Sequence, residues 1–218
     1  SISNVVLPRV TYLNNNASKD KSKKIMFKTL RYASVVAIAV TVGIICISDE
    51  FVPVFFGLGY EKSAVLLKIL AFNVLMSILA NYIGQQCLIS NAKQNQYNIA
   101  ISVGALLNVI LNFFMVERFQ SVGVSVASVV SSGVLFWVVL MFSREIISLR
   151  NIIQMDWKAT IAAIIMFITI YRLNFTHLFV TLAVKIAVGA VVYIAILVIL
   201  REETIQEVFV KIISKRRT

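Results

Sequence analysis

Uncharged polar side chains recur every four residues within a long apolar part of the sequence. They are Asn73, Ser77, Asn81 and Gln85. Residues four apart share a face of a helix, so these side chains would form one polar stripe. A polar group in hydrocarbon needs a hydrogen-bonding partner or a water-filled cavity. The stripe is therefore expected to face protein or water.

A second stripe combines Gly104, Asn108 and Asn112 at the same spacing. Two interpretations are open. Amides inside membranes hydrogen-bond neighbouring helices, a contact that contributes about 0.6–2 kcal/mol. Alternatively, they line a cavity and hydrogen-bond a hydroxyl-rich cargo.

Three cations lie in or beside the apolar segments. Lys185 is expected about 12 Å below the outer end of its helix, at 1.5 Å per residue. Because no carboxylate lies clearly within a membrane span, this lysine either snorkels to the outer surface or contacts a phosphate in a central cavity. Lys68 is shallower and is expected to snorkel. Arg9 is either an ordinary cytoplasmic charge or a gate for an anionic headgroup.

The composition requires lipid as the surrounding solvent. Of 218 residues, 59% are hydrophobic and 14% charged, with a mean hydropathy of +0.88. Soluble domains are roughly 45–50% hydrophobic and about 25% charged. The net charge of +11 could indicate nucleic acid, but the basic residues cluster between apolar runs. Anionic lipids are the simpler partner, and nucleic acid is not expected.

Six segments approach the roughly 20 apolar residues that a membrane-spanning helix needs. The fifth is the weakest, because its uncharged run is short. We predict an all-α bundle with spans at residues 30–48, 63–90, 98–116, 122–142, 159–172 and 178–200.

Positive charge predicts the orientation of this bundle. Of the 21 Lys and Arg residues, sixteen fall on one side of the predicted topology, three fall on the other and two lie within spans. Because cytoplasmic loops retain Lys and Arg, residues 14–29 and 201–218 are expected on the cytoplasmic side of the membrane. Three outer connections are predicted, near 49–62, 117–121 and 173–177. The last two are short, so the helices that they join should be antiparallel neighbours. Amphipathic stretches at 144–158 and 202–217 suit the membrane interface.

The sequence offers little for catalysis or metal binding. His177 is the only histidine, and Cys46 and Cys87 both lie in apolar runs, so neither a metal site nor a cofactor is expected. No nucleophile is paired with a base. A membrane-embedded transferase is a lesser alternative, for which Asp49, Glu50 and His177 are the only outer-side candidates.

Several short motifs occur in an order that resembles one transporter family. They are Val-Leu-Pro-Arg-Val at 6–10, Phe-Phe-Gly at 55–57, Gly-Gln-Gln-Cys-Leu at 84–88, Asn-Ala-Lys at 91–93 and Val-Gly-Val-Ser-Val-Ala at 122–127. Together with Asn108 and Asn112, they resemble the C-terminal half of a polysaccharide repeat-unit flippase of the multidrug/oligosaccharidyl-lipid/polysaccharide exporter superfamily.

This resemblance implies two pseudo-symmetric lobes that carry cargo by alternating access. Residues 1–13 would end a truncated helix, 14–29 form a basic loop, 30–200 one lobe and 201–218 a basic tail. The partners would be an N-terminal lobe and an undecaprenyl-pyrophosphate-linked oligosaccharide. A drug exporter or a lipid II flippase of the same superfamily is the alternative. The cavity candidates are Arg9, Asn73, Asn81, Gln85, Asn108, Asn112 and Lys185.

Overall fold

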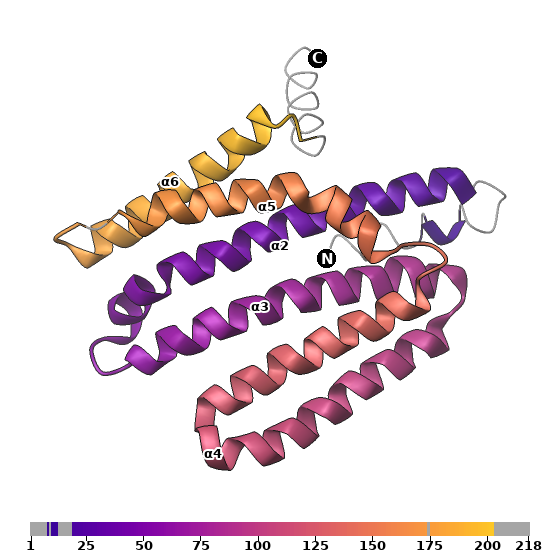
Figure 1. Cartoon of the computed structure of the whole chain (residues 1–218), viewed down its shortest axis with the longest axis horizontal. Coiled ribbons are helices and arrows are strands. Elements are labelled where there is room, and N and C mark those ends of the chain that lie inside the picture. The colour runs from indigo at the N-terminus through magenta and orange to yellow at the C-terminus, as the bar shows by residue number, and fades with distance from the viewer. Residues whose placement is uncertain (1–7, 9, 13–18, 174, 203–218) are drawn as a thin grey trace.

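The computed structural model describes residues 8, 10–12, 19–173 and 175–202, and these residues form helices and no strands. Five of the helices are long and apolar enough to cross a membrane. Helices are expected in such a sequence, because a helix satisfies its own backbone hydrogen bonds in hydrocarbon. The all-α prediction is confirmed (Figure 1).

Helix α2 (Lys19–Phe56) is much longer than the predicted span at 30–48. It takes in the second part of the predicted basic loop at 14–29, which is helical from Lys19 onward. It also extends to Phe56, so Asp49 and Glu50 lie in the helix rather than in the predicted outer connection. The chain then turns at Gly57 and Gly59, whose positive φ angles of 85° and 97° favour glycine.

Helix α3 (Glu61–Ile83) continues through a π-helical turn (Gly84–Leu88) and a 3₁₀ turn (Ile89–Asn91). This continuous segment matches the predicted span at 63–90. Its close approach to the next helix requires Gly84, because a Cβ there would lie 2.1 Å from the ring of Tyr97. The sequence therefore allows the two helices to approach closely at this point.

Helix α4 (Gln94–Phe142) contains two predicted spans in one hairpin. Its backbone turns at Gln120, where φ is 50° and ψ is −133°. The two arms return side by side: a Cβ on Gly104 would lie 3.1 Å from the Cβ of Leu135 on the other arm. The predicted short connection at 117–121, with antiparallel neighbours, is confirmed (Figure 1).

Helix α5 (Leu149–Tyr171) begins with a capping box, in which Ser148 and Asn151 each accept a backbone N–H of the other. The predicted interfacial helix at 144–158 is therefore wrong as a separate element. Residues 143–146 form a turn, and residues 149–158 belong to α5. Their addition supplies the length that the predicted fifth span lacked.

Helix α6 (Leu178–Ile199) follows a short connection and packs against α5. The close contact occurs at Gly189, where a Cβ would lie 2.6 Å from the Cδ1 of Ile170. Antiparallel pairing across the predicted 173–177 connection is thus confirmed. Of the predicted tail at 201–218, the described residues include only Arg201 and Glu202, and most of the predicted helix end at 1–13 also lies outside them.

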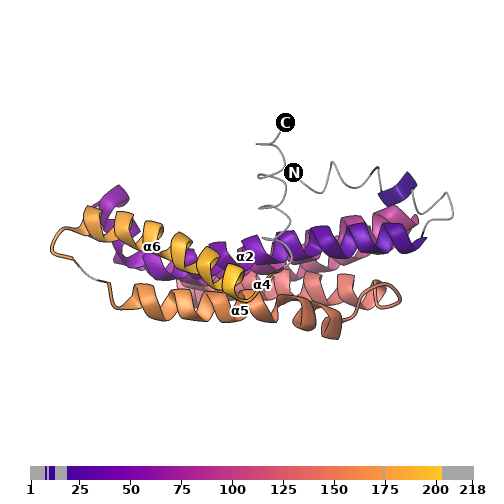
Figure 2. The ribbon, with the colours of Figure 1, turned by 90° about the horizontal axis from the view of Figure 1, so that it is seen from above.

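Two apolar cores meet at α2, which contacts α3, α5 and α6. One core joins the start of α2 to α3 and α4, and the other joins the middle of α2 to α5 and α6. The turns at Gly57, at Gln120 and between α5 and α6 share one end of the molecule, which we call the hairpin end (Figures 1 and 2). The opposite end, with Lys19 and Lys93, is called the Lys93 end.

A charged cavity joined to an apolar groove

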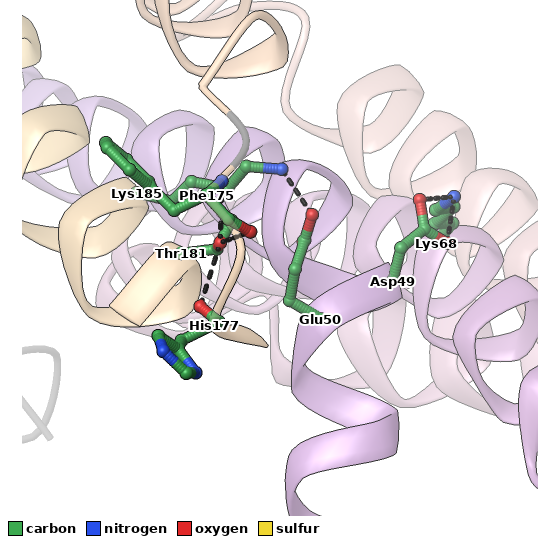
Figure 3. A network of polar contacts seen from close by, with 7 residues as sticks. All are labelled: Asp49, Glu50, Lys68, Phe175, His177, Thr181 and Lys185. Carbon is green, nitrogen blue, oxygen red and sulfur yellow. Dashed lines mark hydrogen bonds and ion pairs between the residues drawn. The ribbon is translucent and has the colours of Figure 1, made fainter. Parts of the chain in front are cut away.

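A buried ion pair connects α6 to α2 near the hairpin end. The ammonium group of Lys185 contacts the Glu50 carboxylate directly (Figure 3). Lys185 is 5% exposed and Glu50 is 8% exposed. The expectation that Lys185 lacks a carboxylate partner is therefore wrong. Glu50 was missed because it was assigned to a loop, whereas α2 continues past it.

Lys68 on α3 is paired in the same region. Its Nζ lies 2.7 Å from both carboxylate oxygens of Asp49 on α2 (Figure 3). This pair is partly open to solvent. The sequence predicted no ion-pair partner for Lys68, and the structure supplies one in Asp49. Asp49 and Glu50, the candidates for a transferase, each hold a lysine instead.

The two ion pairs line one cavity of about 340 Å³. Its walls come from α2, α3, α5 and α6, so it is assembled by helices far apart in the sequence. The Oε2 atom of Glu50 is buried there without a hydrogen-bond partner among the described residues. The remaining lining residues are Ile45, Cys46, Phe167 and Tyr171.

An apolar groove of about 790 Å³ continues from this cavity along α2, between α3 and α5. Ile45 and Phe167 line both spaces, so the cavity and the groove adjoin at these two side chains. Among the described residues that line the groove, Asp156 alone has an ionisable side chain. The result is a charged pocket at one end of a long hydrocarbon-lined surface.

The amide stripe of α3 faces α4. The Ser132 hydroxyl donates to Asn73 Oδ1 at 2.5 Å, and the Tyr97 hydroxyl donates to Asn81 Oδ1 at 2.9 Å. These contacts are interhelical bonds, as expected for amides in a membrane. Gln85 lies in the π-helical turn, with a buried Oε1 that lacks a partner in the described part of the chain.

The stripe of α4 is bonded within its own helix, where the Asn112 amide donates to Asn108 Oδ1 at 2.9 Å. The Oδ1 atom of Asn112 is buried and lacks a described partner. The structure does not bring these amides to Lys185, which is paired with α2. Arg9 lies outside the described residues.

A second polar cluster lies at the Lys93 end of the α2–α5–α6 packing. Arg31 Nε lies 3.5 Å from the buried Glu202 carboxylate, and the Tyr193 hydroxyl donates to the Val35 carbonyl at 2.8 Å. Asp156 is also buried there. Sequence reasoning missed this residue as a membrane carboxylate because it placed residues 144–158 at the interface.

The described residues contain no group of three or more His, Cys, Asp or Glu side chains able to hold a metal ion. His177 lies just before α6, where its carbonyl accepts a hydrogen bond from Thr181 (Figure 3). Cys46 and Cys87 are free thiols.

Comparisons with known proteins agree with the helical membrane architecture. No curated protein and no solved structure matches the chain. The model of one family, described as lipid II flippase MurJ, matches residues 1–210. This match supports the predicted flippase superfamily, but it does not single out a polysaccharide flippase within it. Because it extends over nearly the whole sequence, the chain belongs to the lipid II flippase MurJ family.

Proposed function

We propose that this chain is part of a flippase that moves a polyprenyl-diphosphate-linked saccharide across the bacterial inner membrane. The observation that carries the proposal is the charged cavity that adjoins the apolar groove at Ile45 and Phe167. A lipid-linked diphosphate has the same division, with an anionic group next to a long hydrocarbon chain. The family match supports transport of a lipid-linked substrate rather than an enzymatic reaction.

The lysines of the cavity supply the chemistry for the diphosphate. Without cargo, Glu50 holds Lys185 and Asp49 holds Lys68, so each ammonium group already has an anionic partner. A phosphate oxygen entering the cavity can replace a carboxylate oxygen on each lysine. The exchange keeps each ammonium group paired. It also requires the displaced Glu50 carboxylate to take up a proton or to move into water, because a buried carboxylate without its cation is costly.

Two cargoes share this chemistry. Lipid II is favoured by the family match. An undecaprenyl-pyrophosphate-linked repeat unit for capsule, exopolysaccharide or O-antigen is favoured by the order of the sequence motifs. Both contain a diphosphate, so the cavity does not discriminate between them, and the saccharide must be recognised elsewhere.

The amides and Arg9 remain candidates for contacts with the saccharide or headgroup. Asn108 and Asn112 retain one buried oxygen without a described partner, which a sugar hydroxyl could satisfy. We also propose that the Lys93 end faces the cytoplasm, where its basic residues would contact anionic lipids. An N-terminal lobe of the same protein would complete the transport path.

The test is depletion of the complete protein, followed by measurement of the lipid-linked intermediates in the cytoplasmic leaflet. Accumulation of lipid II with cell lysis would identify the first cargo. Accumulation of repeat units with loss of surface polymer would identify the second. If neither intermediate accumulates in a strain without a redundant flippase, the proposal is contradicted.

A double variant, Lys68→Ala with Lys185→Ala, then tests the cavity itself. We expect it to fail to restore flipping, because the diphosphate loses both cations. The matched control is Lys62→Ala, which removes an exposed lysine one residue into α3. Equal rescue by the double variant and the control would exclude these lysines from the transport site.

A further inference from the structure

The two carboxylates of the charged cavity differ in their access to water. Asp49 and Glu50 are neighbours on α2, and each holds one lysine (Figure 3). The side chain of Asp49 is 65% exposed, whereas that of Glu50 is 11% exposed. The Oε2 atom of Glu50 is also buried without a hydrogen-bond partner among the described residues. Loss of a lysine therefore has different consequences for the two carboxylates.

The other charged or titratable groups that line the cavity come from all four of its helices. They are Cys46 and Asp49 on α2, Lys68 on α3, Tyr171 on α5 and Lys185 on α6. Of these groups, the two lysines are the cations, and Asp49 already holds Lys68. Among the described lining residues, Glu50 therefore depends on Lys185 for its compensating charge.

The proposed cargo brings a second anion to this ion pair. When a phosphate oxygen takes Lys185, the Glu50 carboxylate loses its cation and lies beside the phosphate. Two anions that share a buried site repel each other, which favours the protonated form of one of them. The phosphates of a diphosphate diester are much stronger acids than a carboxyl group, so the proton binds Glu50. A protonated carboxyl group can then donate a hydrogen bond to the phosphate.

Movement into water is the competing outcome for the displaced carboxylate. For Glu50 this movement is hindered, because its side chain is buried and the cargo headgroup would itself occupy the cavity of about 340 Å³ beside it. For Asp49 no such movement is needed, since its side chain is already in contact with water. We therefore expect Asp49 to stay ionised and Glu50 to become neutral.

We propose that the binding of an anionic diphosphate in the charged cavity is coupled to the uptake of a proton by Glu50. The proton comes from bulk water and bonds to a carboxylate oxygen, while Lys185 exchanges this carboxylate for a phosphate oxygen. When the anion leaves, Lys185 pairs with Glu50 again and the proton returns to water. This inference rests on the proposed function and adds a regulation of the same site by pH.

The probe for this coupling is a soluble diphosphate diester with a short prenyl chain and one sugar. Both of its phosphates remain ionised from mildly acidic to neutral pH, so the ligand itself does not titrate. Calorimetry of its binding to the complete protein in lipid nanodiscs, in buffers of different ionisation enthalpy, counts the protons taken up. We expect about one proton per bound anion, and an affinity that strengthens by up to about tenfold for each unit by which the pH falls.

Three variants assign the proton to a residue. Glu50→Gln should bind the probe without this uptake, so its affinity should be nearly independent of pH. Asp49→Asn should retain the uptake, because its carboxylate is not the one that becomes neutral. His177→Gln is the control for a group that titrates in the same pH range. Because His177 lies just before α6 and outside the cavity lining, this variant should bind the probe and take up protons like the native protein.

The possible outcomes separate this inference from the proposed function. Binding of the probe without proton uptake, or equal uptake by the native protein and folded Glu50→Gln, would overturn the coupling and leave the proposed function intact. Absence of binding would contradict both. If Glu50→Gln does not fold, infrared difference spectra of the native protein and Asp49→Asn decide instead. A protonated carboxyl band should appear in both on binding, and its absence would refute proton uptake.

Discussion

The two regions that meet at α2 are stabilised by different polar contacts. Between α3 and α4, neutral amides and hydroxyls hydrogen-bond across the helices. Between α2 and the α5–α6 hairpin, buried ion pairs lie near both ends of the packing, Lys185–Glu50 and Arg31–Glu202. Neutral polar groups in a membrane need hydrogen-bond partners, whereas a charge must also be compensated.

The same two regions differ in burial. In the most apolar 18-residue window of α4, 11% of the residues are buried, against 39% in α5. Exposed apolar side chains of α4 include Leu106, Val109, Phe113 and Phe114. A helix that is apolar all round and still exposed is typical of contact with lipid or with further protein. The α2–α5–α6 region instead buries four charged residues, Glu50, Asp156, Lys185 and Glu202.

The largest expected effect comes from breaking the buried ion pair. Lys185→Met leaves Glu50 buried without its cation, which should lower the free energy of unfolding by about 3–5 kcal/mol. Adding Glu50→Leu should recover most of that loss, because no unpaired charge remains. Denaturation of the complete protein in bicelles measures both variants, with Lys62→Met as the exposed control. An unchanged stability of Lys185→Met would contradict the role of the pair.

A smaller effect is expected in the α3–α4 region. Asn81→Ala removes the hydrogen bond with Tyr97 and should cost about 0.6–1.7 kcal/mol, from the average to the maximum measured for such contacts in a membrane protein. The matched control is Ser128→Ala, whose hydroxyl bonds only within its own helix, to the Val124 carbonyl at 3.0 Å. The same denaturation assay applies. Lost flipping with unchanged stability would instead favour a direct role of Asn81 in binding cargo.

The smallest effect concerns the exposed ion pair between Lys93 and Glu145, at 2.8 Å. The hydrogen bond and the charge of Lys93 lower the pKa of Glu145 below its ordinary value of 4.5. Its stabilising contribution is therefore complete above pH 4.5 and is lost as the pH falls through the lowered pKa. The difference in Tm between the native protein and Glu145→Gln should be small at pH 7 and shrink towards zero at pH 3. A difference independent of pH would exclude this pair as its cause.

The spans and their short connections could be predicted because they depend on local sequence. Long apolar runs form helices wherever water is absent. The connections near Gln120 and before α6 are short, so the helices that they join must pack antiparallel. The spacing of Asn73 and Asn81 likewise placed them on one face. Their interhelical partners agree with the prediction that this stripe faces protein or water.

The membrane class, the helical fold and the polar stripe were thus determined by the sequence alone, because hydropathy and periodicity act over a few turns. Only the tertiary structure decided which charges are paired. Lys185 and Glu50 are 135 positions apart, and their contact depends on how far α2 extends and how α6 packs against it. Asp156 entered the groove for the same reason, since the extension of α5 places it among helices rather than at an interface.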